Sequence, residues 1–253
     1  MKSFFRELFY KVITSYVCRA FTNETGIGNQ KNRETWLQKT LNNIPAGKKI
    51  LDAGAGELQY KKFCNHLQYV SQDFAQYDGM GNSEGLQMQK WDNSKVDIIS
   101  DISNLPVSDS EFDAVMCVEV FEHIPNPIEA VKEFKRVLKK DGFLILTAPF
   151  CSLTHFAPYY FANGYSKYWY EHVLESNGFK IDEITPNGNY FEYLAQELRR
   201  VPQIGQRYSN SNLFKKEEIA IKITLSMLER FSKRDKGSCE LLNFGFHVKA
   251  SKA

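Results

Sequence analysis

The sequence contains no uninterrupted apolar run of the length that a membrane-spanning helix requires, which argues against an integral membrane protein. Its five cysteines are Cys18, Cys64, Cys117, Cys151 and Cys239. They form neither a Cys-x-x-Cys pair nor a Cys/His cluster at zinc spacing, so the sequence signals no metal site. A scattered, odd-numbered set of this kind indicates buried thiols in a reducing compartment rather than a disulfide framework, and we expect a cytoplasmic protein.

Net charge is also small, because the chain has 32 Lys and Arg residues and 30 Asp and Glu residues, which gives a formal charge of +2 at pH 7. A domain that binds nucleic acid would carry a strongly basic face, so we expect no nucleic-acid partner. Repeats and low-complexity tracts are lacking as well. What the sequence does have is 43% hydrophobic and 25% charged residues over 253 positions, which is ordinary for a globular chain with one large core.

Two helices are predicted before the main domain, and together they define an N-terminal helical cap over residues 1–44. Over residues 3–20 apolar side chains recur at helical spacing, and the opposite face is basic. Arg6 and Lys11 interrupt this stretch, so it lacks the continuous apolar core of a secretory signal. We favour a helix packed on the main domain, and the alternative is peripheral contact with a membrane surface. The second helix is predicted over residues 33–42.

From residue 45 onward, short apolar runs alternate with amphipathic stretches, which is typical of an α/β fold. The predicted strands span residues 49–52, 69–73, 96–101, 112–120, 143–148, 179–185 and 241–250. The predicted helices span residues 57–66, 126–140, 166–177, 189–200 and 215–231, with a loop over 201–212. The residues predicted to form the buried stripe of the second of these helices are Ile128, Val131, Phe134, Val137 and Leu138. This order predicts a Rossmann-like three-layer sandwich with a mostly parallel seven-stranded sheet, an antiparallel last strand and a ligand site at the carboxyl ends of the strands.

The strongest motif is Asp52-Ala53-Gly54-Ala55-Gly56, which directly follows the first strand of the main domain. Two glycines at this spacing allow a tight strand-to-helix turn and let the backbone approach a ligand closely. Free N–H groups at the start of a following helix suit a carboxylate or a phosphate. The alternative is that Gly54 and Gly56 serve the turn alone.

The residues around this turn favour a ligand with an amino-acid end over a dinucleotide. A dinucleotide-binding turn reads Gly-x-Gly-x-x-Gly, but its third glycine position is Gln59 here. The Gly-Lys-Ser/Thr ending of a nucleotide triphosphate loop is absent too. Asp52 would repel a pyrophosphate, whereas its carboxylate can accept a hydrogen bond from a cationic amino group. A nicotinamide-dependent oxidoreductase is therefore the weaker alternative.

Acidic residues also end the second and third predicted strands. Asp73 follows the glycine turn by about 20 residues, where a carboxylate that binds ribose hydroxyls lies in folds of this type. Asp101 could accept a hydrogen bond from an adenine amino group while Ile102 packs on the ring. Both acids would also suit a role as strand-end caps, so the sequence leaves this second interpretation open.

Several short motifs follow one another along the chain. They are Asp-Ala-Gly-Ala-Gly-Glu (52–57), Asp-Ile-Ser-Asn-Leu-Pro (101–106), Phe-Asp-Ala-Val (112–115), Glu-Val-Phe-Glu-His-Ile (119–124) and Lys-Asp-Gly-Phe-Leu (140–144). In this order and spacing, the chain resembles class I S-adenosylmethionine-dependent methyltransferases, most of all the small-molecule group called type 11. The resemblance covers residues 48–150 well, is a generic pattern over residues 151–185, and includes no motif outside that span. The chain departs from the commonest pattern at Leu58, which stands in place of a third glycine.

The resemblance implies S-adenosylmethionine as the cofactor, residues 45–253 as the methyltransferase domain, and residues 151–240 as the part with acceptor-side elements and insertions. The implied cofactor-binding residues are Asp52, Gly54, Ala55 and Gly56 for the methionine part, Asp73 for ribose, Phe74, Asp101 and Ile102 for adenine, Glu119 and Val120 for the floor of the site, and His123 as a residue that closes over it. The alternatives are a solvated loop position for Glu119 and a packing role for His123.

The implied reaction is methyl transfer to a small-molecule acceptor, and we expect O-methylation of a sugar, a lipid-linked compound or another metabolite. In-line displacement on an activated methyl group depends mainly on positioning, and a base helps where the acceptor is a hydroxyl. His155 is the best candidate for a catalytic base, in an aromatic-rich segment over residues 149–170, and a structural role is its alternative. A non-catalytic nucleotide-binding module is the alternative function.

Overall fold

The computed structural model of the chain describes residues 23–253, which form two compact units. One unit consists of residues 23–32 and 188–243, and the other consists of residues 33–187 and 244–253. The helix expected over residues 3–20 lies outside the described residues. The expected boundary between a cap and a main domain after residue 44 remains a prediction.

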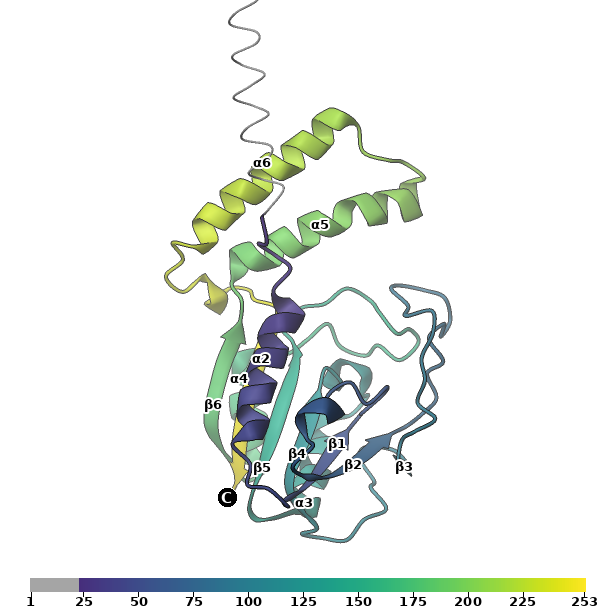
Figure 1. Ribbon diagram of the computed structural model, residues 1–253, viewed down its shortest axis with the longest axis vertical. Coiled ribbons are helices and arrows are strands. Elements are labelled where there is room, and N and C mark those ends of the chain that lie inside the picture. The colour runs from purple at the N-terminus through teal and green to yellow at the C-terminus, as the bar shows by residue number, and fades with distance from the viewer. Residues whose placement is uncertain (1–22) are drawn as a thin grey trace, which may run out of the picture. The chain divides into compact units, whose positions relative to one another are not determined.

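The larger unit is built on a seven-stranded sheet in the order β3-β2-β1-β4-β5-β7-β6 (Figure 1). The strands are β1 (Lys49–Ala53), β2 (Gln68–Asp73), β3 (Ile98–Ile99), β4 (Phe112–Val118), β5 (Leu138–Pro149), β6 (Phe179–Asn187) and β7 (Gly245–Lys252). Neighbouring strands pair in parallel except at β7, which runs antiparallel to both β5 and β6. This topology confirms the predicted Rossmann-like sheet with its antiparallel last strand.

The central strands are buried on both faces of the sheet. Successive residues of a strand point to opposite faces, so the side chains of β4 alternate between two hydrophobic clusters. Val115 and Cys117 lie in one cluster, and Ala114 and Met116 lie in the other. Burial on both faces is the reason that this strand is an uninterrupted apolar run in the sequence.

Helices cover both faces of the sheet and complete three layers (Figure 1). α2 (Asn29–Asn42) packs on one face, where its Leu41 is fully buried. α3 (Pro127–Val137) and α4 (Lys167–Ser176) pack on the other face, where Phe134 of α3 is fully buried. Burial of each large apolar side chain in this way contributes roughly 1.5–3 kcal/mol to the free energy of folding. The two clusters therefore stabilise the position of the strands relative to the helices.

The smaller unit contains two long helices, α5 (Tyr190–Ser209) and α6 (Lys215–Ser232). Asn189 caps the start of α5, since its side chain accepts hydrogen bonds from two N–H groups of the first helical turn. The loop predicted over residues 201–212 is wrong for residues 201–209, because α5 continues to Ser209 with Pro202 inside the helix. Apolar side chains of α5 pack against α6, and this packing outweighs the helix-breaking tendency of proline.

The helix predicted over residues 57–66 is also wrong. This stretch consists of turns and one short 3-10 helix, Lys61–Phe63. Leu58 has a φ of +61°, a left-handed conformation that cannot continue a right-handed α-helix. The conformation of this stretch is therefore determined by the glycine turn before it, and not by the helical pattern of its own residues.

The end of α3 differs from the prediction as well. The helix ends at Val137 and not near Lys140, because β5 begins at once with Leu138. Lys139 lies in that strand and its ammonium group contacts the Asp113 carboxylate at 2.8 Å. Ile128, which we expected in the buried stripe of α3, is 42% exposed.

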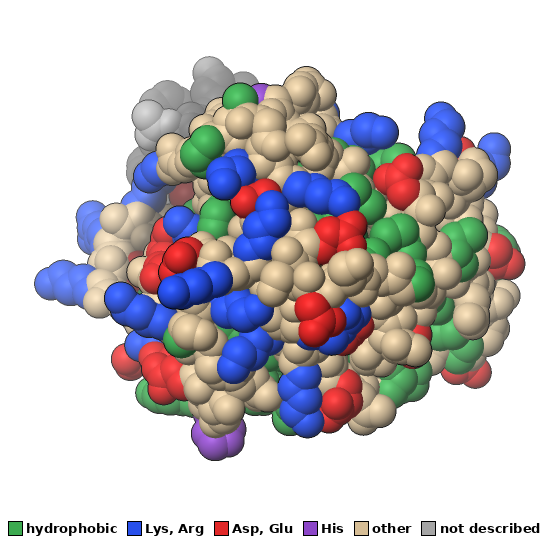
Figure 2. Space-filling view, turned by 90° about the horizontal axis from the view of Figure 1, so that it is seen from below, with side chains coloured by type: hydrophobic (Ala, Val, Ile, Leu, Met, Phe, Trp, Pro, Cys, Tyr) green, Lys and Arg blue, Asp and Glu red, His purple; other side chains and the backbone are tan. Residues whose placement is uncertain are grey.

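Charge on the visible surface is mixed in sign. On the face drawn in Figure 2, Lys and Arg side chains are interspersed with Asp and Glu side chains, with single hydrophobic residues between them. This pattern agrees with the small net charge. No helix within residues 23–253 is both long enough and apolar enough to cross a membrane.

Removal of the Phe134 ring tests whether α3 is held by its buried face. Phe134→Ala leaves a cavity between α3 and the sheet, so we expect the free energy of unfolding to fall by about 3–5 kcal/mol in a urea titration. Ile128→Ala on the exposed side of the same helix is the matched control, with an expected change of about 0.5 kcal/mol or less. Equal losses in the two variants would contradict the packing described.

Candidate functional site

The backbone turn after β1 is fixed by hydrogen bonds to the end of β2. The N–H groups of Gly54 and Ala55 both donate to the carbonyl oxygen of Gln72, at 2.8 and 2.9 Å. The N–H group of Gly56 donates to Oδ2 of Asp73 at 2.9 Å. Three consecutive residues of the turn are thus bound to the last two residues of the neighbouring strand.

Glycine is required in this turn by conformation and by close approach. Gly54 and Gly56 have φ values of +79° and +50°, which other residues rarely adopt. A Cβ on Gly54 would lie 2.5 Å from Cγ2 of Val120, and a Cβ on Gly56 would lie 2.4 Å from Cζ2 of Trp91. Val120 and Trp91 therefore form walls against the two glycines. The resemblance predicted Val120 as part of the floor of the cofactor site, which stays a prediction, and the sequence held no signal for Trp91.

Asp73 joins the turn to the segment that follows β2. Its Oδ1 accepts a hydrogen bond from the N–H group of Ala75 at 2.8 Å, while its Oδ2 accepts the one from Gly56. Phe74, the next residue, contacts the ring of Tyr159 edge to face, with 4.9 Å between the ring centroids. The carboxylate has further lone pairs on both oxygens, so it can accept additional hydrogen bonds.

Asp52 is a buried carboxylate, 2% exposed, at the end of β1. The hydroxyl of Tyr69 donates a hydrogen bond to its Oδ2 at 2.6 Å. Burial raises the pKa of Asp52 to about 7, and the nearby charge of Asp73 acts in the same direction while the Tyr69 hydrogen bond opposes it. A positive charge placed beside Asp52 would relieve this penalty and favour the ionised carboxylate.

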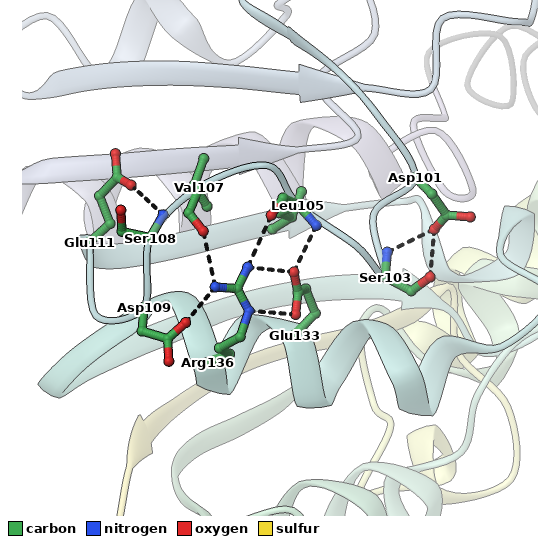
Figure 3. Close-up of polar contacts among 9 residues, drawn as sticks. All are labelled: Asp101, Ser103, Leu105, Val107, Ser108, Asp109, Glu111, Glu133 and Arg136. Carbon is green, nitrogen blue, oxygen red and sulfur yellow. Dashed lines mark hydrogen bonds and ion pairs between the residues drawn. The ribbon is translucent and has the colours of Figure 1, made fainter.

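Asp101 and Ile102 begin the loop that follows β3. Asp101 is exposed, and its Oδ1 accepts hydrogen bonds from the N–H group and the hydroxyl of Ser103, at 2.8 and 2.6 Å (Figure 3). Ile102 is buried against the hydrophobic cluster that also contains Leu105. Asp101 thus caps the loop with one carboxylate oxygen and Ile102 packs at the edge of the core, while their contacts with adenine stay a prediction.

Arg136 of α3 holds the loop after β3 in place (Figure 3). Its guanidinium group donates to the carbonyl oxygens of Leu105 and Val107, each at 3.0 Å, and to Asp109 at 2.6 Å. It also forms two hydrogen bonds with the carboxylate of Glu133, and these hold the pKa of Glu133 below its ordinary value. This network fixes the loop that carries the predicted adenine contacts, and sequence reasoning did not identify it.

Glu119 lies just beyond β4 in a left-handed conformation, with a φ of +54°. Its Oε1 accepts a hydrogen bond from the hydroxyl of Thr147 at 2.8 Å, and its Oε2 forms an ion pair with Arg33 at 3.0 Å. The alternative of a solvated loop residue does not fit, because both carboxylate oxygens have protein partners. Glu119 and Val120 thus occupy a constrained backbone position next to the glycine turn.

His123 and His155 lie against each other, although they come from the ends of different strands. Their ring centroids are 4.7 Å apart and the ring planes cross at 82°. Oε1 of the buried Glu122 lies 3.8 Å from Nε2 of His123 and 3.7 Å from Nε2 of His155. Sequence reasoning did not single out Glu122, because its partner His155 is distant in the sequence.

The two histidines have different electrostatic environments. Burial lowers the pKa of His123, and the neighbouring Glu122 compensates only in part. Burial also acts to lower the pKa of His155, but Glu122 and the carbonyl of Leu153 outweigh that effect and raise it. His155, the residue predicted to be a catalytic base, therefore faces a buried carboxylate.

An aromatic cluster joins the segments that follow β2 and β5. The ring of Phe156 stacks on Tyr77, with centroids 4.3 Å apart, and on His123, with centroids 5.0 Å apart. Trp91 meets Phe156 edge to face at 5.2 Å. Backbone hydrogen bonds between Leu86 and the Thr154–Phe156 stretch pin the two segments together.

The remaining aromatic residues of the 149–170 segment do not share one role. Tyr165 is buried, and its hydroxyl donates to the carbonyl oxygen of Phe121 at 2.8 Å. Trp169 contacts both Phe121 and Tyr165. These two residues fill the core beneath the site, whereas Tyr160 lies beside His155, with centroids 5.2 Å apart.

Comparison with known proteins finds a family model that matches the part of the chain containing the glycine turn. Residues 51–146 match the family described as a methyltransferase domain, of type 11. The fold is similar to the crystal structure of a SAM-dependent methyltransferase from Archaeoglobus fulgidus, with a TM-score of 0.54 and 17% identity over 92% of this chain and 98% of that one.

Two relatives show partial similarity in sequence. A ubiquinone biosynthesis O-methyltransferase from Dechloromonas aromatica is 29% identical over 46% of this chain and 49% of its own length. The cycloartenol-C-24-methyltransferase 1 of Oryza sativa subsp. japonica is 29% identical over 51% of this chain and 38% of its own length. The chain thus spans less than half the length of these relatives. Residues 51–146, which are less than half of the chain, therefore resemble a methyltransferase domain.

The buried carboxylate of Asp52 predicts a pH dependence of stability. Its pKa is about 7 in the folded chain, against roughly 3.9 in an unfolded chain. Between these values the unfolded chain releases the proton and the folded chain keeps it, so the contribution of this group to stability falls as pH rises. Asn does not titrate, so the Asp52→Asn variant does not lose stability in this way. We expect the difference in free energy of unfolding, variant minus unchanged protein, to increase from about pH 4 to about pH 7.

Urea unfolding of the cofactor-free protein across this range checks the prediction. Asp97 supplies the opposite case, because hydrogen bonds from Ser71 lower the pKa of its carboxyl group. Asp97→Asn should therefore lose stability at neutral pH and approach the unchanged protein as pH falls. A pH-independent difference between Asp52→Asn and the unchanged protein would contradict the assignment.

Proposed function

We propose that the chain transfers the methyl group of S-adenosylmethionine to an oxygen atom of a small-molecule acceptor. The observation that carries this proposal is the glycine turn after β1, bound by its backbone to Asp73 and Gln72 at the end of β2. Ligands of open α/β sheets bind at the carboxyl ends of the strands. Residues 51–146, which match the methyltransferase domain, include this turn and both strand ends.

Two features of the turn fit this cofactor. Gly54 and Gly56 leave backbone surface that a Cβ would fill, which suits close approach by the methionine part along Gly54–Gly56. Asp52 is a buried carboxylate with a raised pKa, and the cationic amino group of the cofactor would offset its desolvation. A dinucleotide would instead bring a pyrophosphate towards this acid, so the cofactor with the amino-acid end is the better fit.

The other cofactor contacts are proposals of the same kind. Asp73 would accept hydrogen bonds from the ribose hydroxyls with the lone pairs that Gly56 and Ala75 leave free. The remaining residues are assigned to adenine, to the floor of the site and to its closure. They are Phe74, Asp101 and Ile102 for adenine, Glu119 and Val120 for the floor, and His123 for closure.

When bound, the cofactor supplies a methyl group already activated by its sulfonium charge. The protein then has to hold the acceptor oxygen in line with the carbon–sulfur bond and to exclude water. The aromatic cluster of Tyr77, Trp91 and Phe156 offers an apolar wall for this purpose. His155 and its neighbour Glu122 are the groups we assign to loss of the acceptor proton.

Oxygen as the attacked atom rests on this histidine and on one comparison. A hydroxyl acceptor has to lose its proton, and a histidine beside the acceptor can promote that loss, so the presence of His155 favours oxygen as the attacked atom. The similarity to a ubiquinone biosynthesis O-methyltransferase supports a hydroxyl acceptor, while the similarity to a sterol methyltransferase supports a small molecule more generally.

Cofactor affinity of Asp73→Asn tests the binding half of the proposal. The amide loses a charged acceptor, and a hydrogen bond to a charged group is worth about 1.5–3 kcal/mol, so we expect affinity for S-adenosylmethionine to fall by about tenfold to one-hundredfold. Calorimetric titration measures this change. Asp97→Asn is the matched control, since Asp97 also accepts a backbone N–H bond, from Ser71, and has no hydrogen bond to the glycine turn among those that the structure shows for it. Unchanged affinity in Asp73→Asn would remove the ribose assignment.

Transfer of a labelled methyl group tests the catalytic half. The purified chain, labelled S-adenosylmethionine and a metabolite extract should yield a small molecule that carries one additional methyl group. Fragment masses then place that group on oxygen, and a carbon- or nitrogen-methylated product would contradict the choice of atom. Saturable cofactor binding without any labelled product would favour the binding-module alternative.

A further inference from the structure

We propose that Glu122, His123 and His155 form a binding site for one divalent first-row transition-metal ion. Their three ligand atoms, one carboxylate oxygen and two imidazole nitrogens, all lie within 4.8 Å of one another. Metal–nitrogen and metal–oxygen bonds of about 2.0–2.1 Å separate neighbouring ligand atoms by roughly 3.0–3.4 Å. The observed separations from the carboxylate oxygen, 3.7 and 3.8 Å, lie slightly above this range, and the two imidazole nitrogens lie within 4.8 Å of each other, so the three groups must move closer together around an ion.

Both imidazole rings are held with Nε2 directed at the same carboxylate. Nδ1 of His123 lies 2.5 Å from the carbonyl oxygen of Tyr159, and Nδ1 of His155 lies 2.8 Å from that of Leu153. A carbonyl oxygen accepts hydrogen bonds and does not donate them, so each Nδ1 carries the proton. In the neutral ring Nε2 then has a free lone pair. Metal-binding histidines are commonly oriented by this same contact to a backbone carbonyl.

Glu122 supplies an independent observation, because its charge is buried and incompletely paired. The residue is 1% exposed, and Oε2 has no hydrogen-bond partner among the described residues. The distances from Oε1 to the two Nε2 atoms exceed the length of a hydrogen bond. A buried carboxylate without sufficient partners is costly, and a divalent cation between the three groups would pair its charge.

The fold fixes this triad at the carboxyl edge of the sheet. Glu122 and His123 belong to the short 3-10 helix η2 (Phe121–His123), which follows β4. His155 follows β5, in the stretch whose backbone pairs with Leu86. Because two chain segments deliver the ligands, the Cys/His spacing that indicates a metal site in a sequence is absent, which is why the sequence predicted none.

The ligand set indicates the class of metal. Two imidazoles and one carboxylate suit Zn²⁺, Mn²⁺, Fe²⁺ or Co²⁺, whereas Mg²⁺ and Ca²⁺ prefer oxygen ligands throughout. Three protein ligands leave at least one coordination position open, as in catalytic rather than structural sites.

The open position suggests how the site acts, and this step rests on the function proposed above. An acceptor hydroxyl bound to the metal has a lowered pKa and releases its proton to solvent. The resulting oxygen attacks the methyl carbon, and the electron pair of the carbon–sulfur bond passes to sulfur. The products are a methyl ether, S-adenosylhomocysteine and one proton. In this refinement, the metal ion promotes loss of the acceptor proton, and His155 contributes to that step as a metal ligand, which replaces the direct role as a base assigned to it above.

Metal titration of the full chain, stripped of ions with a chelator, tests the site without any acceptor. We expect one Co²⁺ per chain, with visible d–d absorption and a dissociation constant of about 1 µM or lower, and competition by Zn²⁺. His155→Gln and Glu122→Gln should each weaken Co²⁺ binding about tenfold or more. His172→Gln, a change at an exposed histidine of α4, is the matched control and should leave binding unchanged.

Two results would overturn the inference at different levels. If the unchanged protein binds no ion at a ratio of one per chain, the site itself is wrong, whatever the variants do. If Co²⁺ binds as expected but methyl transfer is the same before and after metal removal, the role in acceptor activation is wrong and the site remains. Zn²⁺ should also raise the melting temperature of the unchanged protein and not that of His155→Gln, which covers the case of a weakly folded variant.

Discussion

The Asp73 carboxylate accepts hydrogen bonds from the N–H groups of Gly56 and Ala75, and it thereby joins the turn after β1 to the end of β2. Buried backbone donors without partners are costly, so the conformation of both segments depends on this one side chain. The turn can come this close only because it has no side chains where Val120 and Trp91 pack against it. Strands β1, β2 and β4 and the segment after β2 therefore converge at a single rigid point, and the candidate site is built around it.

The same edge of the sheet concentrates negative charge, and the fold balances each carboxylate differently. Asp52 receives one hydrogen bond from Tyr69 and keeps a raised pKa. Glu119 is neutralised by an ion pair with Arg33. Glu122 has weak contacts to two histidines and one oxygen without a partner within the described residues. Because buried charge is costly, a site with this imbalance favours cationic ligands, and both the sulfonium cofactor and a divalent metal ion meet that demand.

Features set by local pattern could be predicted from the sequence, and features set by tertiary contact could not. Strands such as β4 are apolar runs because both faces are buried, and the glycine turn is visible because its spacing is dictated by backbone conformation. The helix expected over residues 57–66 failed because Leu58 adopts a left-handed conformation imposed by the turn before it. The loop expected over residues 201–212 failed because packing of α5 on α6 overrides Pro202.

The two halves of the candidate site differ in the same way. Among the residues that we assign to the cofactor, Asp73 ends β2 and Asp52 precedes the last residue of β1, so their positions follow once the strand order is known. The acceptor side depends on contacts between segments, for example the stacking of Phe156 on Tyr77 and the approach of His155 to Glu122. Those contacts leave no local pattern in the sequence, since their partners are far apart along the chain and each one by itself is an ordinary aromatic, acidic or histidine residue. Acceptor choice can therefore change through the segments after β2 and β5 while the glycine turn stays intact, and for that reason a family resemblance predicts the cofactor better than the substrate.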